Sequence, residues 1–328
     1  MQCESRGDDD TPWDECEAVS HGDSRTLEEC FSLFGVAHSL TRTPEAVRRA
    51  TEDVIREFAE DGVVYLELRS TPREVPNVMT KLQYVKEVVK AIEKCSAEKG
   101  IVVKLLVSMD RRQGRAVAEE TRALLSRARR EHPGVVAGVD LSGDPAEGSV
   151  ADYLPVLRAC REEGLRTSLH CAEIPQPDEV RAILDFKPDR IGHATCIHPN
   201  TGGSEELWEN LVTSGVPVEI CLTSNVKCKT VDSYENHHFK FLSERRHPLS
   251  LCTDDKGVFA TSLSTEFMIA AKTFHLSKEH LWKICFDSIS FAFASEAEKA
   301  SLREHLMKWK IEVLGEHNTA MNYTMPTI

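Results

Sequence analysis

The chain has 328 residues, 41% of them hydrophobic and 28% charged, which is the composition of a folded globular protein rather than of a disordered one. It contains no run of about 18 apolar residues that could span a membrane, and its acidic start is unlike a secretory or mitochondrial signal. The formal net charge of −13 argues against a nucleic-acid polymer as partner but is compatible with a mononucleotide. We therefore expect a cytoplasmic monomer with no membrane or nucleic-acid partner.

The predicted helices follow one another along most of the chain. Residues 1–24 are polar and acidic and are interpreted as a disordered leader, and residues 313–328 as a flexible tail. Thr43 and Pro44 are typical of a helix start. Apolar spacing and glycine stops predict helices over residues 43–62, 81–99, 115–132, 150–163, 177–185 and 204–213, and three more between 262 and 312.

Short β-rich runs separate these helices. They predict strands over residues 63–69, 101–107, 134–141, 166–170, 190–193, 216–222 and 248–253. Apolar strands that alternate with helices indicate parallel βα units in a single domain over residues 25–312. No G-x-G-x-x-G or Walker loop follows any strand, which removes the usual support for an open nucleotide-binding sheet. We therefore expect a TIM-type (β/α)8 barrel of which seven strands are recognisable and the first strand-helix unit is missing.

The eleven cysteines include no C-x-x-C pair and follow no disulfide framework. Several lie within apolar runs, such as Cys221 between Ile220 and Leu222, where cysteine acts as a small hydrophobic residue. We expect reduced thiols.

Polar or titratable residues stand at the end of every predicted strand. In a βα barrel these ends form one face, where the chemistry of such enzymes gathers. The runs are Arg69–Arg73, Asp110–Arg112, Asp140–Asp144, His170–Glu173, His193–Thr195, Thr223–Asn225 and Asp254–Lys256.

Three of these strand ends together indicate a metal centre. By itself, His170 with Glu173 is more often a structural polar pair, and adjacent acids such as Asp254 and Asp255 commonly cap a helix. However, two neighbouring carboxylates repel each other unless a cation or a donor lies beside them. With His193 on a third strand end, the pattern favours metal-assisted hydrolysis, and His and Asp ligands suit Zn²⁺.

These runs also resemble a known family. Ser168–Glu173, Arg190–Thr195 and Leu251–Asp255 are similar to the signatures of the adenosine and AMP deaminases, and the resemblance extends from about residue 25 to 312. Five further runs resemble the branch of this family that acts on N6-methyl-AMP: Glu67–Arg73, Met109–Arg112, Val139–Pro145, Cys221–Val226 and Asp254–Ala260.

The resemblance implies a role for each matching residue. It implies that His170 and Asp254 hold Zn²⁺, that Glu173 protonates the purine ring at N1, and that His193 orients or deprotonates the attacking water. Contacts to the substrate are implied for Asp255 at N7 and the Gly143 backbone at N3, and for the pocket residues His38, Ser70, Thr71, Pro72, Arg73 and Asp110, with Arg73 suited to a phosphate. The implied reaction converts N6-methyl-AMP, or a related N6-substituted purine nucleoside monophosphate, to IMP and methylamine.

The sequence departs from the family at its start. Family members begin with a strand bearing His-x-His, which completes the zinc site, and none of the 13 histidines here forms such a pair. We interpret this as replacement of the first strand-helix unit by an unrelated 24-residue leader, which should weaken zinc binding. Two alternatives follow: an inactive isoform that only binds nucleotide or a protein partner, and a deaminase that acts on the nucleoside adenosine or on adenine.

Overall fold

The structure is a computed structural model that describes residues 27–314, so the interpretations of the leader and of the tail beyond residue 314 lie outside it. Its strands are β1 (Tyr65–Ser70), β2 (Val102–Asp110), β3 (Val136–Ser142), β4 (Arg166–Cys171), β5 (Arg190–His193), β6 (Val218–Ile220) and β7 (Leu249–Leu251). Its helices are α2 (Leu27–Leu40), α3 (Pro44–Glu60), α4 (Lys81–Lys99), α5 (Gly114–Glu131), α6 (Val150–Glu162), α7 (Pro177–Phe186), α8 (Glu205–Ser214), α9 (Leu222–Lys227), α10 (Phe239–Glu244), α11 (Lys256–Phe259), α12 (Leu263–Thr273), α13 (Lys278–Ser288) and α14 (Glu296–Leu314).

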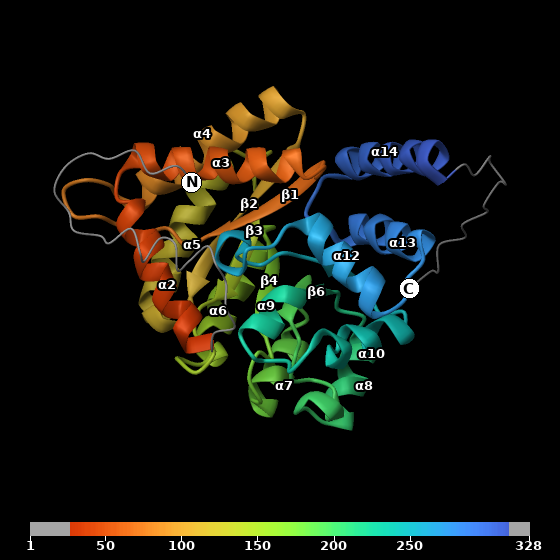
Figure 1. The fold of residues 1–328 in the computed structure, drawn as a ribbon. Coiled ribbons are helices and arrows are strands. Elements are labelled where there is room, and N and C mark those ends of the chain that lie inside the picture. Colours follow the sequence, from red (N-terminus) through yellow and green to blue (C-terminus); the bar gives the residue numbers. More distant parts are fainter. Residues whose placement is uncertain (1–26, 315–328) are drawn as a thin grey trace.

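The seven strands form one parallel sheet whose spatial order is the chain order, β1 to β7 (Figure 1). Such an order arises when each strand is joined to the next by a helix on the outside, which is the connectivity of a (β/α)8 barrel. Within residues 27–314, neither β1 nor β7 pairs with a further strand. The predicted fold class and the seven recognisable strands are therefore confirmed, and the sheet is a curled, open barrel.

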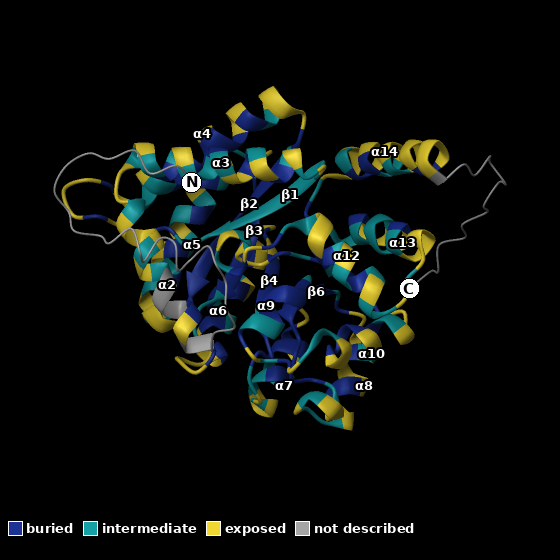
Figure 2. Cartoon of the chain, in the orientation of Figure 1, coloured by how far each residue is buried: buried dark blue, intermediate teal, exposed yellow. Residues whose placement is uncertain are grey.

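The sheet is the core of the molecule. Strands β2 to β6 are almost wholly buried between the outer helices and the barrel interior, whereas β1 is half-buried along its whole length (Figure 2). This difference follows from the position of β1 at an edge of the sheet. No helix in the described part of the chain is long and apolar enough to cross a membrane.

Local sequence signals account for most helix ends. Thr43 accepts a hydrogen bond from the Ala46 backbone just before α3, and Pro44 is the first residue of that helix. At α4, Thr80 and Gln83 form a capping box, and the helix ends at Gly100 in the left-handed conformation. These helices begin and end close to the predicted residues.

The structure differs from the predicted elements after β6. The strand predicted over 216–222 spans only Val218–Ile220, and the short helix α9 starts at Leu222. The reason is a long-range contact: the backbone N–H of Thr223 donates to the buried Glu266 carboxylate at 3.1 Å, and the Thr223 hydroxyl donates to its other oxygen. Thr223, Ser224 and Asn225 therefore lie in a helix and not at the end of an extended strand.

Helix α3, which precedes the edge strand β1, also contacts the segments that follow the other edge strand, β7. Near its C-terminal end, Glu57 forms an ion pair with Lys256, the first residue of α11. Asp61, which caps α3, accepts hydrogen bonds from the Ser264 backbone at 3.0 Å and from its hydroxyl at 2.5 Å. An ion pair and hydrogen bonds thus connect α3, which precedes β1, to the segments that follow β7.

A ring of alternating charges crosses the barrel interior. Arg69 and Glu67 project from β1, and they pair with Glu219 on β6 and Arg190 on β5. Arg190 Nε lies 2.7 Å from Glu219 Oε1, which joins the two pairs, and the ring is completed by β1 itself, which carries both Glu67 and Arg69. Although burial alone would raise it, the two guanidinium groups hold the pKa of Glu219 at about 2. The edge strand is thereby tied to the opposite side of the sheet.

Candidate active site

Side chains from three strand ends converge at the mouth of the barrel. His193, the last residue of β5, has its Nε2 atom 3.7 Å from Glu173 Oε2 and 3.9 Å from Asp254 Oδ2. The ring of His170 on β4 lies beside that of His193, with centroids 5.2 Å apart. The structure thus brings together the four residues that the sequence assigns to metal binding and catalysis.

His170 is fixed by a buried acid behind it. Its Nδ1 atom lies 3.1 Å from Asp140 Oδ1 and 3.1 Å from the Leu141 carbonyl oxygen, which leaves Nε2 directed away from these partners. Burial alone would lower the pKa of His170, but the Asp140 carboxylate raises it to about 9. Asp140 is fully buried, and its pKa is held well below its usual range by His170 and Arg69 despite burial. An imidazole held by a carboxylate at one nitrogen is the arrangement found behind metal-binding histidines.

The two adjacent acids after β7 have different surroundings. Asp254 Oδ2 accepts a hydrogen bond from the Ser224 hydroxyl at 2.7 Å. Asp255 opens onto the mouth, where loss of solvent and the neighbouring Asp254 carboxylate raise its pKa to about 7. The repulsion expected from the sequence is therefore present in the structure.

Strained backbone marks the same strand ends. Ala172 (φ 57°), His193 (φ 62°), Ala194 (φ 59°) and Asp254 (φ 54°) all adopt the left-handed conformation that residues with a side chain avoid. Such strain persists only where surrounding contacts impose it, and it gathers at active sites. Histidine and aspartate adopt this conformation more often than most residues, but the alanines at 172 and 194 give no signal of it in the sequence.

The donor atoms at the mouth suit a divalent metal. His170 Nε2 and the Asp254 carboxylate, the pair implied by the family resemblance, are a nitrogen and an oxygen ligand of the kind that zinc accepts. A second combination shares Asp254: ligand atoms of His193, Cys221 and Asp254 all lie within 4.8 Å of one another. Asp254 belongs to both combinations, and the family resemblance, rather than the geometry, favours His170 as its partner.

A second cluster lies beside these residues, where α2 meets the ends of β1 and β2. Arg73 Nη1 donates to the His38 carbonyl oxygen at 2.9 Å, and the same guanidinium binds Thr41. Loss of solvent and the nearby Arg73 and Arg112 lower the pKa of His38. Arg112 forms a bidentate ion pair with Asp110, in which Nη2 lies 2.6 Å from Oδ2. Because the Asp110 carboxylate balances Arg112, Arg73 is the group of this cluster that suits an anionic part of a ligand.

Gly143 adjoins this cluster and cannot be replaced without strain. Its φ is +100°, and a Cβ atom on it would lie 2.4 Å from Asp110 Oδ1. Glycine is therefore required by the fold at this position, in addition to any contact with a ligand.

The remaining predicted pocket residues follow β1. Ser70 shares a 2.7 Å hydrogen bond with the Tyr84 hydroxyl, Thr71 is half-buried, and Pro72 is buried. Their roles in substrate binding stay predictions.

Two neighbouring histidines were not singled out from the sequence. His237 and His238 are fully buried behind His193, and Asn225 lies between the rings of His237 and His193. Their adjacency in the sequence carries no signal, because both belong to an irregular segment between α9 and α10 rather than to a strand end.

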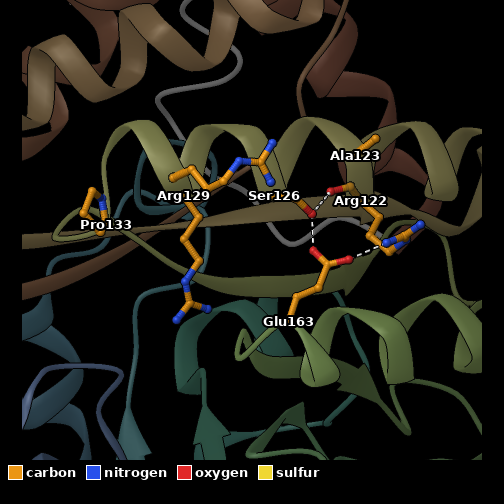
Figure 3. A pocket seen from close by; sticks show the side chains of 7 residues that line it. Arg122, Ala123, Ser126, Arg129, Pro133 and Glu163 are labelled. Atoms are coloured by element: carbon orange, nitrogen blue, oxygen red, sulfur yellow. Dashed lines mark hydrogen bonds and ion pairs between the residues drawn. The ribbon is translucent and has the colours of Figure 1, made fainter.

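A separate cavity of about 710 Å³ lies at the opposite end of the barrel, between α5 and the end of α6. Its lining includes Arg122 and Ser126, both of which bind Glu163 (Figure 3). Because this carboxylate already satisfies those groups, and because no residue of the mouth reaches it, we assign the cavity no catalytic role.

Comparison with known proteins agrees with the geometry. The adenosine deaminase family profile matches residues 6–309. N6-methyl-AMP deaminases of Danio rerio and Homo sapiens are each 46% identical to this chain over 90% of its length, covering 86% and 83% of their own. The crystal structure of arabidopsis ADAL complexed with IMP superposes with a TM-score of 0.84 at 39% identity, over 92% of this chain and 88% of that one. This chain therefore belongs to the adenosine deaminase family and is, by class, a deaminating hydrolase.

Proposed function

We propose that this chain is a zinc-dependent deaminase that hydrolyses N6-methyl-AMP, and related N6-substituted purine nucleoside monophosphates, to IMP and methylamine. The observation that carries the proposal is the convergence of Glu173 and Asp254 on His193, whose Nε2 atom lies within 4 Å of each carboxylate. The relatives named for this reaction, and the related structure with IMP, support the same substrate class.

The residues divide the reaction between them. A zinc ion at His170 and Asp254 would lower the pKa of a water molecule, so that hydroxide is available near neutral pH. Glu173 donates a proton to N1 of the purine as oxygen adds to C6, and His193 holds the attacking oxygen. Asp255 binds N7, to which a protonated carboxyl group can donate a hydrogen bond. The C6–N bond then breaks and methylamine leaves with one proton.

The Arg73 guanidinium supports a phosphorylated substrate over a nucleoside. It donates to the backbone oxygens of His38 and Thr41 and to the Thr41 hydroxyl, whereas Arg112 is balanced by the Asp110 carboxylate. A guanidinium that is bound to neutral oxygens keeps its charge for a phosphate, which it can hold through two hydrogen bonds. Turnover of N6-methyl-AMP should therefore exceed that of N6-methyladenosine, and equal rates would count against a phosphate-binding role.

A second candidate is nucleotide binding without turnover. It is favoured by the open sheet of the described residues and by the two zinc ligands that the resemblance supplies, where catalytic zinc sites usually have three protein ligands. Zinc content and N6-methyl-AMP turnover, measured on the purified full chain, distinguish the two. Stoichiometric zinc with steady release of methylamine establishes the enzyme, and IMP binding without zinc or turnover establishes the second candidate.

A further inference from the structure

A chain of buried hydrogen bonds runs from the protein interior to His193. The backbone N–H of Phe239 donates to His237 Nδ1 at 3.1 Å. His237 Nε2 lies 3.1 Å from Asn225 Oδ1, and Asn225 Nδ2 lies 3.1 Å from His193 Nδ1. The three side chains are at most 3% exposed, so water does not compete for these bonds.

The hydrogen bond from the Phe239 backbone determines which atom donates in each of the other hydrogen bonds of the chain. A backbone N–H can only donate, so His237 Nδ1 is an acceptor and the proton of this neutral ring is on Nε2. His237 Nε2 then donates to the amide oxygen of Asn225, which turns the amide nitrogen toward His193. Because an amide nitrogen is a donor only, His193 Nδ1 accepts, and the proton of His193 lies on Nε2. That proton points into the mouth, toward Glu173 and Asp254.

His238 holds the backbone of the same histidine. Its Nε2 atom lies 2.7 Å from the His193 carbonyl oxygen, and its ring stacks on that of His237 at 4.2 Å. Since Nε2 donates to that carbonyl oxygen, the buried Nδ1 of the neutral ring carries no proton, and it has no hydrogen-bond partner among the described residues. The bond stabilises His193 in its left-handed conformation, with φ at 62°.

We propose that His237, Asn225 and His238 are positioning residues that keep the resting His193 in the Nε2–H tautomer, so that it offers a hydrogen-bond donor to the mouth. In this state His193 cannot take a proton at Nε2. It holds the attacking oxygen by donation, and Glu173 remains the group that moves protons. Burial keeps the pKa of His237 well below its ordinary value, which is consistent with a neutral ring in the chain. The kinetic part of this inference rests on the proposed function, whereas the tautomer does not.

The tautomer can be read directly from the full chain labelled with ¹⁵N-histidine. Two-bond ¹H–¹⁵N spectra separate pyridine-type from pyrrole-type ring nitrogens, and His193→Gln identifies the signals. The expected result is a pyridine-type Nδ1 and a pyrrole-type Nε2 in His193. In Asn225→Asp the carboxylate accepts from both rings, so His193 Nδ1 becomes protonated. A pyrrole-type Nδ1 in the unaltered chain would overturn the inference.

Kinetics of matched variants test the positioning role. Asn225→Asp and His237→Leu should lower kcat for N6-methyl-AMP by about 10–100-fold, the usual cost of losing such an outer partner, with little change in KM. His237→Gln retains a donor facing Asn225 and should restore most of the lost rate. The control is His247→Asn, because His247 is also buried and bonded to a backbone oxygen, that of Val216 at 2.8 Å, but has no link to the mouth.

The outcomes separate this inference from the proposed function. If the unaltered chain has the expected spectrum but no turnover, the proposed function fails and the tautomer assignment stands. If the chain is active but Asn225→Asp behaves like the His247→Asn control, the positioning role is overturned. Thermal melts of every variant identify loss of folding, and for any variant that does not fold, the spectrum of the unaltered chain still decides the tautomer.

Discussion

Arg69 on the edge strand β1 forms an ion pair with Glu219 on β6 across the interior of the sheet. The same guanidinium lies 3.6 Å from Asp140 Oδ1 and donates to Ser168 Oγ at 2.9 Å. Arg69 therefore links the charge ring of the barrel interior to the acid behind His170, and the stability of the fold and the geometry of the mouth depend on the same side chain.

Replacement of Arg69 by leucine should be strongly destabilising, because it leaves Glu219 with one buried guanidinium instead of two and Asp140 with none. We expect a loss of about 3–5 kcal/mol in the free energy of unfolding, measured by urea denaturation. The control is Arg166→Leu, which removes an ion pair with Asp189 in which the arginine side chain is 60% exposed. That change should cost no more than about 1 kcal/mol, and similar losses in the two variants would contradict a special role for the ring.

Gly143→Ala should impair both stability and nucleotide binding. An alanine at a φ of +100° is strained by about 1–3 kcal/mol, and its Cβ atom would displace the Asp110 carboxylate. We expect a lower melting temperature and weaker IMP binding by calorimetry. Gly134→Ala is the matched control, since a Cβ atom at Gly134 would meet nothing within 4 Å. Unchanged IMP affinity in Gly143→Ala would show that the contact with Asp110 is not needed for binding.

Glu173→Gln should remove catalysis while leaving binding intact. The amide preserves the shape of the side chain but cannot donate an acidic proton to the purine ring, so we expect kcat to fall by about 10²–10⁴-fold. The dissociation constant of IMP should stay close to that of the unaltered chain. Asp178→Asn, on the exposed start of α7, serves as the control because its side chain is 99% exposed. A rate similar to that of this control would exclude Glu173 as the proton donor.

The stability of the chain should fall as the solution becomes acidic, and His247 should contribute to this. Burial lowers its pKa below the ordinary 6.5, so the folded state favours the neutral ring. Its contribution is fully present above pH 6.5 and is lost as the pH falls below that value, because the unfolded chain then binds the proton more readily. Urea unfolding at several pH values between about 8 and 5 should show a shallower pH dependence for His247→Asn. Parallel curves would contradict this.

The fold and the strand-end residues could be predicted from the sequence because both depend on local patterns. The Thr80–Gln83 capping box and Gly100 define a helix without reference to the rest of the chain, and a residue such as His170 is placed by the end of its own strand. The alternation of strands and helices then implies that these ends share one face.

The parts that could not be predicted depend on contacts between distant segments. Nothing near Thr223 indicates that Glu266, 43 residues further on, starts a helix there. The same holds for His237, whose partner Asn225 lies in a helix where the sequence predicts the run that follows a strand. The left-handed φ of His193 is also supported by a distant residue, through the hydrogen bond from His238 to the His193 carbonyl oxygen.

The attachment of α3 to the segments after β7 has a consequence for the behaviour of the protein in concentrated solution. Within residues 27–314, β1 has a strand partner on one side only. Such an edge offers backbone donors and acceptors to any other exposed strand, and this is a common beginning of aggregation. The ion pair of Glu57 with Lys256 and the hydrogen bond of Asp61 with Ser264 hold α3 against the segments that follow β7. In this position α3 hinders the approach of another sheet to the open edge of β1. Substitutions that remove these two contacts should therefore cause the protein to self-associate, which light scattering detects, before any helical content is lost.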